Sequence, residues 1–335
     1  MDIDQIVGYL WSQITLIQCL GFLFLGITRH VLWLALVTLT FTWKLIHELI
    51  VDYNTSSKWP GITSNDIALV TGGSHGLGRA IVNNLLEKNV KKVIIFDIEP
   101  PGSSDARCEY VKCDLNDSND LSTKIDRLVG ELASKDQHIS ILVNNAGIRI
   151  NGSVLEVSED DINRSMQINF VSPVLLIQRV IKQYMAKNNG TTTTTTTGST
   201  STAAMSPLTI VSVASVLGWI SPCRLSLYSA AKAALINANQ SLMRELKAYD
   251  QIRILYATPG QLDTRMFADV EPPKQFFAPV VKRDDLAKAI VDRIERGQQG
   301  NLCRPLYTNV VPLVSALPLP LQDLIRDITG IDKCI

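Results

Sequence analysis

The stretch Thr71-Gly72-Gly73-Ser74-His75-Gly76-Leu77-Gly78 decides the fold of this chain. It follows a short apolar run, Ile67–Val70, and precedes an amphipathic run that begins near Arg79. Glycines at such a strand-to-helix turn let the backbone approach a pyrophosphate at the positive N-terminus of the helix. An acidic residue at the end of the next apolar run makes this pattern more specific. Here that residue is Asp97, 19 positions beyond Gly78. The whole arrangement is typical of a dinucleotide-binding site.

Short apolar runs alternate with longer amphipathic ones around this turn, which is the rhythm of strand–helix–strand units in a parallel sheet. The apolar runs lack polar alternation, as expected for strands covered on both faces. The expected strands are Ile67–Val70, Val93–Phe96, Tyr110–Cys113, Ile139–Val143, Leu208–Val213 and Arg253–Ala257. The expected helices are Arg79–Lys88, Leu121–Ser134, Asp160–Ala186, Tyr228–Tyr249 and Asp284–Arg296. We predict an α/β fold, with a Rossmann-type doubly wound parallel sheet in a single catalytic domain.

Asp97 also indicates which nicotinamide cofactor the chain prefers. Its carboxylate would accept hydrogen bonds from the adenosine ribose and repel a 2′-phosphate, which favours NAD over NADP. Glu99 adds a second negative charge nearby, whereas His75 and Arg79 are cations of the kind that sometimes accompany NADP. We expect NAD as the cofactor, with NADP as the alternative.

The chain divides into an N-terminal anchor with its linker, residues 1–60, and a catalytic domain, residues 61–335. Within the domain, residues 188–206 hold seven consecutive threonines. Such a run buries almost no apolar surface, so we expect a disordered surface insert. Residues 302–335 form an apolar tail, in which four prolines argue against a spanning helix. The tail would either rest on a membrane or cap the substrate pocket.

The N-terminal segment carries much of the apolar excess of the chain, whose mean hydropathy is +0.14. Gln5–Thr28 contains no charged residue, and its 24 positions are long enough to cross a hydrocarbon core of about 30 Å. The following stretch, Val31–Trp43, is too short to span alone. Either the first segment spans and the second lies at the interface, or both form a shallow hairpin. A cleaved signal peptide and a buried core helix are the alternatives, and the acidic Asp2 and Asp4 disfavour the first.

The charges around this segment predict its orientation. Acidic residues precede it whereas Arg29 and Lys44 follow it, which places the C-terminal side in the cytosol by the positive-inside rule. We therefore expect a protein of the endoplasmic reticulum membrane, the lipid droplet or both, with its catalytic domain facing the cytosol. Glycosylation of any N-x-S/T sequon would contradict this topology. The sequons are Asn54, Asn116, Asn151, Asn163, Asn189 and Asn239.

Composition excludes several other classes of protein. The 32 basic and 32 acidic residues balance, so no basic stripe for nucleic acid is expected. The six cysteines are scattered without a CxxC pair, which indicates reduced thiols and no metal site. The composition neither predicts nor excludes a homodimer of this chain.

The TGxxxGxG spacing resembles that of the single-domain short-chain dehydrogenase/reductase family, and later motifs follow in that family's order. Asp114, at the end of the third expected strand, matches the residue that contacts the adenine ring in the family. Asn144-Asn145-Ala146-Gly147 matches the NNAG motif, which supports the sheet and the cofactor ribose. Pro259-Gly260-Gln261-Leu262-Asp263-Thr264 resembles the PGxxxT motif, whose threonine engages the nicotinamide carboxamide. The resemblance implies an NAD(P)-dependent oxidoreductase acting on CH–OH groups.

Tyr228-Ser229-Ala230-Ala231-Lys232 is a YxxxK motif on an expected helix. Its i, i+4 spacing places the lysine ammonium close to the phenol. Free tyrosine has a pKa of about 10, too high for a general acid/base at neutral pH, and we expect the lysine cation and an oxidised nicotinamide to lower it. Ser215 lies 13 residues before the tyrosine, which is the spacing of the family's catalytic serine. Its hydroxyl would hold the substrate oxygen.

Asn169 resembles the fourth catalytic member of the family, which kinks its helix and holds a water against the lysine. The threonine-rich insert accounts for its unusually long distance from Ser215. The expected catalytic residues are thus Ser215, Tyr228, Lys232 and Asn169. The expected cofactor-binding residues are Gly72, Ser74, His75, Gly76, Leu77, Gly78, Asp97, Asp114, Asn145, Ala146, Gly147, Tyr228, Lys232, Pro259, Gly260 and Thr264.

The substrate is less sharply defined by the sequence. Met266, Phe267, Phe276 and Phe277 suggest an apolar lid, although ordinary core packing explains them equally well. Together with the anchor and the tail, they resemble the membrane-bound branch that acts on retinol, 17β-hydroxysteroids and related lipids. We expect hydride transfer between NAD(P) and a lipophilic alcohol or ketone. The alternative is a catalytically silent membrane or lipid-droplet scaffold that keeps the fold.

Overall fold

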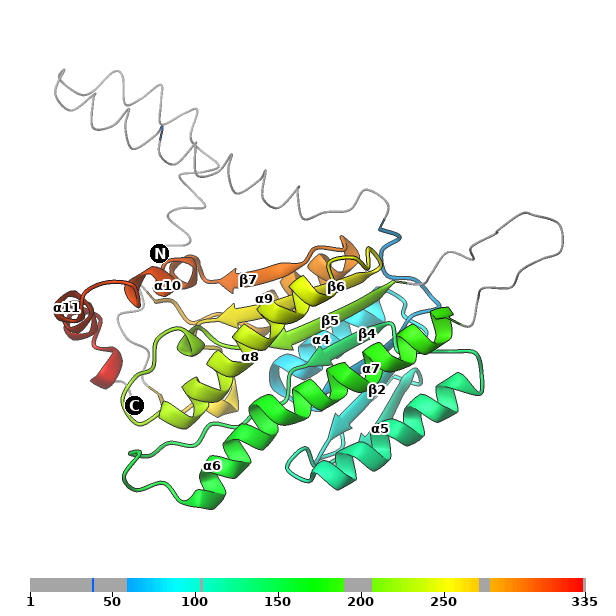
Figure 1. Cartoon of the computed structure of the whole chain (residues 1–335), viewed down its shortest axis with the longest axis horizontal. Helices are drawn as coiled ribbons and strands as arrows, with labels where there is room; N and C mark the ends of the chain where they lie inside the picture. The colour runs from blue at the N-terminus through cyan, green and yellow to red at the C-terminus, as the bar shows by residue number, and fades with distance from the viewer. Residues whose placement is uncertain (1–37, 39–58, 103–104, 190–206, 271–277, 334–335) are drawn as a thin grey trace.

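The computed structural model describes residues 38, 59–102, 105–189, 207–270 and 278–333. Its architecture has three layers, a central parallel sheet with helices packed on both of its faces (Figure 1). The expected α/β class is therefore confirmed.

Seven parallel strands form the sheet, in the order β3-β2-β1-β4-β5-β6-β7. Their bounds are β1 Ile67–Thr71, β2 Lys92–Asp97, β3 Cys108–Lys112, β4 Ile141–Asn144, β5 Leu208–Val213, β6 Ile252–Pro259 and β7 Gly300–Arg304. The chain order reverses between β1 and β4, so successive connections leave the sheet in opposite directions there. Such a switch point opens a crevice at the carboxyl ends of the strands, where α/β proteins bind ligands.

Helices cover both faces of the sheet because alternate residues of each strand face opposite sides. In β1, Ala68 and Val70 pack in one core with α4 (Gly76–Glu87) and α9 (Arg283–Glu295). Its other residues, Ile67 and Leu69, pack in a second core with α5 and α7. The helices of that second layer are α5 Ser118–Ala133, α6 Glu159–Met166, α7 Ser172–Asn189 and α8 Ser226–Glu245. Burial on both faces explains why the strand sequences lack polar alternation.

The expected helix Asp160–Ala186 is not continuous. A π-helix, η1 (Gln167–Val171), separates α6 from α7. Within it, Asn169 Nδ2 donates hydrogen bonds to the carbonyl oxygens of Ser165 and Ile148, each at 3.0 Å. A side chain that bonds inside the helical ladder is a known cause of such bulges. α7 also runs through Asn189, so it includes the first two residues assigned to the threonine-rich insert.

The seventh strand was not predicted, because only Leu302 of its five residues is fully buried and no apolar run marks it. The predicted apolar tail therefore begins too early, since residues 302–304 belong to the sheet edge. The rest of the tail forms short helices: η4 Leu306–Asn309, α10 Val311–Val314, α11 Leu319–Thr329 and η5 Ile331–Lys333.

The predicted anchor in residues 1–60 and the remainder of the threonine-rich insert lie almost wholly outside the described residues, and both stay predictions. Across the part of the chain that the structure describes, no helix combines the length and apolar character that a membrane crossing requires.

Candidate active site

A cavity of about 810 Å³ lies at the carboxyl ends of the strands, around the switch point. Its volume falls within the roughly 300–1,000 Å³ usual for ligand sites. It is lined by every expected site residue except Gly78 and Asn169. These residues are Gly72, Ser74, His75, Gly76, Leu77, Asp97, Asp114, Asn145, Ala146, Gly147, Ser215, Tyr228, Lys232, Pro259, Gly260 and Thr264.

The glycine turn needs its glycines at specific points. Gly72 and Gly76 have φ of +64° and +55°, in the left-handed region that side chains disfavour. Gly78 does not line the cavity, but a Cβ there would collide with the Gly72 carbonyl and lie 2.5 Å from Asn145 Nδ2. Gly78 thus lets the first turn of α4 pack directly on the loop, so that the helix N-terminus points at the cavity.

Hydrogen bonds connect the loop after β4 to the end of β1. The hydroxyl of Thr71 accepts hydrogen bonds from the backbone N–H groups of Asn145 (3.0 Å) and Ala146 (3.1 Å). In return, Asn145 Nδ2 donates to the carbonyl oxygens of Thr71 (3.0 Å) and Gly72 (3.1 Å). The NNAG segment therefore holds the glycine turn in place from the neighbouring strand. Thr71 is a supporting residue that the sequence interpretation did not single out.

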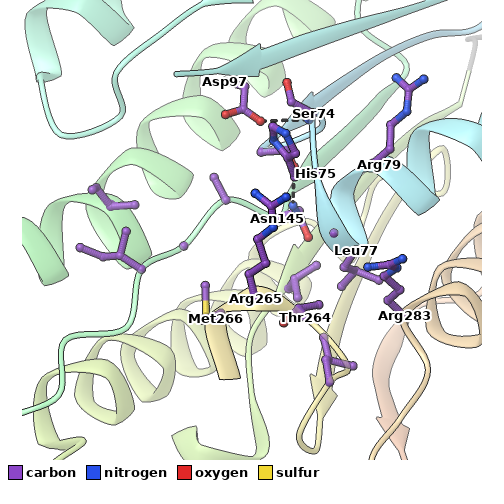
Figure 2. Close-up of a pocket in the computed structure, with 18 of the residues that line it drawn as sticks. Ser74, His75, Leu77, Arg79, Asp97, Asn145, Thr264, Arg265, Met266 and Arg283 are labelled. Atoms are coloured by element: carbon purple, nitrogen blue, oxygen red, sulfur yellow. Dashed lines mark hydrogen bonds between the residues drawn. The ribbon is translucent and has the colours of Figure 1, made fainter. Parts of the chain in front are cut away.

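Asp97 closes the adenosine end of the cavity. Its Oδ2 accepts a hydrogen bond from Ser74 N–H at 2.9 Å, as Figure 2 shows, and its Oδ1 accepts one from Ile98 N–H at 2.8 Å. The Ser74 hydroxyl donates to the Glu99 carbonyl at 2.6 Å, and the Glu99 carboxylate lies 3.9 Å from His75 Nδ1. A fixed carboxylate beside a glycine turn fits the ribose hydroxyls of a dinucleotide.

Four arginines line the same cavity: Arg79, Arg164, Arg265 and Arg283. Figure 2 shows Arg265 beside Thr264 and Arg283 beside Leu77 in the first turn of α4, with Arg79 farther from them, on the Ser74 side. Cations and a helix N-terminus together favour an anionic group, as a pyrophosphate would be. Arg265 and Arg283 were not among the site residues predicted from the sequence. Their positions, directly after Thr264 and at the start of α9, are the sequence features that could have indicated them. The donor set thus fits a nicotinamide dinucleotide.

Ser215, Tyr228 and Lys232 converge at the other end of the cavity. Ser215 follows β5 and accepts a hydrogen bond from Leu217 N–H (3.1 Å), while Tyr228 and Lys232 share one face of α8. All three side chains are buried, and the lysine ammonium donates to the Val213 carbonyl at 2.8 Å. Lys232 Nζ lies 5.7 Å from the centre of the Tyr228 ring. A hydroxyl, a phenol and an ammonium are therefore assembled around one reaction space.

Burial dominates the acid–base properties of this cluster. It raises the pKa of Tyr228 to about 12, although hydrogen bonding with Ser215 and the charge of Arg149 both lower it. In the protein alone, desolvation of the phenolate outweighs the neighbouring groups, and the lowering expected from an oxidised nicotinamide stays a prediction. Burial also lowers the pKa of Lys232 to about 8, which brings its proton exchange close to neutral pH.

Asn169 supports the cluster from behind. It is fully buried, its Oδ1 accepts from Ile148 N–H at 3.1 Å, and its Nδ2 is engaged by backbone carbonyls. A Cβ on Gly147 would lie 2.8 Å from Asn169 Oδ1 and 3.4 Å from Lys232 Nζ, so both side chains crowd this glycine. Asn169 thus fixes the backbone beside Lys232. Its role in holding a water stays a prediction.

Arg149 is the residue that sequence reasoning missed most clearly. Its side chain is 9% exposed, it forms an ion pair with Asp269, and its guanidinium carbon lies 5.3 Å from the centre of the Phe267 ring. Phe267 in turn meets the Tyr228 ring edge-on at 6.1 Å. Arg149 therefore joins the loop after β4 to the segment after Thr264 and acts electrostatically on the tyrosine. Its position two residues beyond Gly147 is the only sequence feature that could have indicated a role in the site.

Comparison with known proteins decides the family. A family model described as short chain dehydrogenase matches residues 66–275, which is more than half of the chain and includes the cavity-lining residues from Gly72 to Phe267. The chain belongs to the short-chain dehydrogenase family. With the assembled serine, tyrosine and lysine, this short-chain dehydrogenase is an NAD(P)-dependent oxidoreductase acting on CH–OH groups, as expected.

Curated relatives agree with this assignment. The uncharacterized oxidoreductase TDA5 of Saccharomyces cerevisiae is 34% identical over 308 residues, covering 90% of this chain and 88% of the relative. The 3-oxoacyl-[acyl-carrier-protein] reductase FabG of Escherichia coli is 28% identical over 205 residues, covering 60% of this chain and 75% of the reductase.

Solved structures share the fold of this short-chain dehydrogenase. A 4-hydroxyisoleucine dehydrogenase complexed with NADH has a TM-score of 0.59 at 24% identity, covering 71% of this chain and 96% of that one. A short chain dehydrogenase from Burkholderia cenocepacia in complex with NADP has a TM-score of 0.61 at 19% identity, covering 79% and 98%.

Proposed function

We propose that this short-chain dehydrogenase interconverts a lipophilic secondary or primary alcohol and its carbonyl compound, with NAD as the preferred cofactor. The observation that carries the proposal is the apolar wall beside the catalytic hydroxyls. Ile148, Leu262, Met266 and Phe267 line the cavity, and Phe267 packs directly against Tyr228. An apolar wall desolvates a hydrocarbon substrate while the few polar groups orient its oxygen. Of the expected lid, Phe276 and Phe277 lie outside the described residues.

The chain's own residues supply the proton chemistry. When bound, the nicotinamide supplies the hydride acceptor or donor and, when oxidised, a positive charge. Ser215 holds the substrate oxygen, and in oxidation the Tyr228 phenolate takes the hydroxyl proton. Lys232, with its pKa of about 8, stabilises the phenolate and passes the proton outward. Because burial holds the tyrosine pKa near 12, the phenolate form depends on cations close to it.

The preference for NAD rests on Asp97. Its carboxylate faces the cavity and is held by Ser74 and Ile98 N–H groups, so it cannot swing away to admit a 2′-phosphate. In Figure 2, Arg79 lies on the opposite side of Ser74 from Asp97. The fixed negative charge supports NAD, and Arg79 supports NADP as the alternative.

The proposal also includes where in the cell the enzyme acts and on which lipids. The uncharged run Gln5–Thr28 supports a membrane anchor, with the catalytic domain on the cytosolic face of the endoplasmic reticulum or lipid droplet. With such an anchor, retinoids, 17β-hydroxysteroids and related lipids are the substrates to test first, and a homodimer is the assembly to test. A silent scaffold is disfavoured, because a scaffold has no need of the converged Ser215, Tyr228 and Lys232.

The decisive experiment is a panel of lipid alcohols and ketones assayed with NAD(H) and NADP(H) on the full-length enzyme. We expect turnover of at least one lipophilic pair, faster with NAD(H), and none by the Tyr228→Phe variant. Short water-soluble alcohols serve as the comparison within the panel. Faster turnover of short polar substrates than of every lipid would overturn the proposed substrate class.

A further inference from the structure

The C-terminal segment after β7 carries an unusual density of exposed apolar side chains. Seven large ones lie between positions 310 and 328, each at least 36% exposed, against five in all the other described residues. They are Val310, Leu313, Leu317, Leu319, Leu321, Leu324 and Ile328. Single exposed apolar residues are ordinary, but a contiguous set marks an interaction site. We call Leu313, Leu317, Leu321, Leu324 and Ile328 the tail face.

The helix α11 is turned the opposite way to a typical surface helix. Its polar side makes hydrogen bonds within the protein: Gln322 Nε2 donates to the Leu317 carbonyl in the tail itself at 2.7 Å, and Arg326 Nη2 donates to the Ser221 carbonyl in a distant loop at 2.8 Å. Its apolar residues at positions 321, 324 and 328 recur at helical spacing and face solvent. A globular helix normally buries that side. Polar contacts thus hold α11 in place and leave its apolar side uncovered by the residues that the structure describes.

The tail face lies beside the mouth of the catalytic cavity. Ser221 belongs to the loop between the catalytic Ser215 and Tyr228, and Asp332 accepts a hydrogen bond from Cys223 N–H of the same loop at 2.8 Å. On the other flank, Tyr307 packs on Gly260, which lines the cavity. Figure 1 shows α10 and α11 beyond the arrowheads of β6 and β7, which mark the edge of the sheet that holds the cavity-lining Pro259 and Gly260.

We propose that the tail face docks on a phospholipid bilayer and presents the mouth of the cavity to it. This rests on the proposed function, through its membrane anchor and lipophilic substrate. Amphipathic helices bind membranes by sinking an apolar side about 5–10 Å into the headgroup boundary. An anchor in the uncharged run Gln5–Thr28 would keep the catalytic domain at such a surface. A lipophilic alcohol then passes from the bilayer into the cavity without crossing water.

A second copy of the chain fits the tail face less well. α11 has 11 residues and is about 16 Å long, so it offers far less than the roughly 800 Å² per partner of a stable interface. The tail face consists of leucine and isoleucine, without the tyrosine, tryptophan or arginine that anchor protein–protein contacts. Aliphatic side chains alone suit acyl chains, whose packing needs no specific partner.

The test uses full-length protein reconstituted in phosphatidylcholine vesicles, with an environment-sensitive fluorescent amino acid at Ile328 in one variant and at Asp323 in another. Both positions are exposed on α11, about 140° apart at 100° per residue. We expect the probe at 328 to shift to the blue and to be quenched by doxyl-labelled lipid, whereas the probe at 323 reports water in both measurements.

An aqueous signal from both probes would overturn the proposal. So would a blue shift at 328 that grows with protein concentration and ignores doxyl-labelled lipid, since that result means a second copy. The readout involves no turnover, so it separates the two proposals. A quenched probe with an inactive lipid panel means that docking holds and the substrate class fails, and the reverse combination means that docking alone fails.

Discussion

The catalytic cavity and the tail face both depart from the usual rule that apolar side chains are buried and polar ones are exposed. The cavity buries polar groups, whereas the tail face exposes apolar ones. In the cavity, Tyr228 and Lys232 are buried polar groups, and each depends on contacts that offset its desolvation. In the tail face, Leu324 and Ile328 are apolar groups exposed to solvent, with no such dependence. Buried polar groups are costly to disturb, whereas exposed apolar ones are replaceable as far as folding is concerned. The two regions should therefore respond differently to substitution.

The largest effect is expected for Tyr228→Phe. Loss of the general acid/base should lower kcat by about 10²–10⁴-fold. Cofactor binding should stay close to the wild-type value, because the ring still packs against Phe267. Stopped-flow turnover and a fluorescence titration with NADH measure the two quantities separately. A variant with wild-type turnover would remove Tyr228 from the mechanism.

Gly78→Ala tests how tightly the cavity is built. The new Cβ would collide with the Gly72 carbonyl, so we expect a loss of about 1–3 kcal/mol in unfolding free energy and weaker cofactor binding. Gly130→Ala is the matched control, because that helical glycine in α5 has open space around it and should stabilise the protein by roughly 1 kcal/mol. Urea unfolding of both variants makes the comparison, and equal effects would contradict the tight contact.

Asp97→Asn tests the adenosine end of the cavity, where the charge of the side chain matters more than its packing. The amide keeps an acceptor for Ser74 N–H but removes the charge that opposes a 2′-phosphate. The ratio of kcat/KM for NADP to that for NAD should rise about tenfold, or about 1.4 kcal/mol. Glu99→Gln, which changes a more distant carboxylate, should alter the ratio less. An unchanged ratio in Asp97→Asn would argue against NAD selection by this residue.

Arg149→Met probes the electrostatic link to the tyrosine. Arg149 lowers the pKa of Tyr228, so removing the cation should raise that pKa. Oxidation requires the phenolate, and its rate rises with pH through this pKa. The pH profile of alcohol oxidation should therefore move to higher pH, with a several-fold lower rate at fixed pH. Asp269→Asn removes the ion-pair partner but keeps the cation, so its profile should not move upward.

The smallest effect on stability is expected in the tail face. Leu324→Ser shortens a side chain that is 53% exposed and has little intramolecular packing to lose, so unfolding free energy should change by no more than about 0.5 kcal/mol. In the vesicle-reconstituted protein, the same substitution should reduce the quenching of the probe at position 328 by doxyl-labelled lipid. A large stability loss would show that the side chain packs within the protein, and would weaken the contrast between the two regions.

Much of the cavity could be predicted from the sequence because its parts are encoded locally. The glycine turn, the Asp97 that ends β2 and the i, i+4 pair on α8 each lie within a few residues of a strand or helix end. The edge strand β7 could not be predicted, since an edge strand needs no apolar run. Nor could the ion pair between Arg149 and Asp269, which joins residues 120 positions apart.

By itself, the sequence determined the doubly wound sheet and the candidates for the reacting groups, because local spacing decides which side chains share a helix face or a strand end. Only the tertiary structure decided how those groups ionise. The pKa of Tyr228 is raised and that of Lys232 is lowered by burial, and burial depends on everything packed around them. The outward apolar side of α11 was decided in the same way, by polar contacts from Arg326 to a distant loop. Desolvation and long-range contact are properties of the packed molecule, and residue spacing does not carry them.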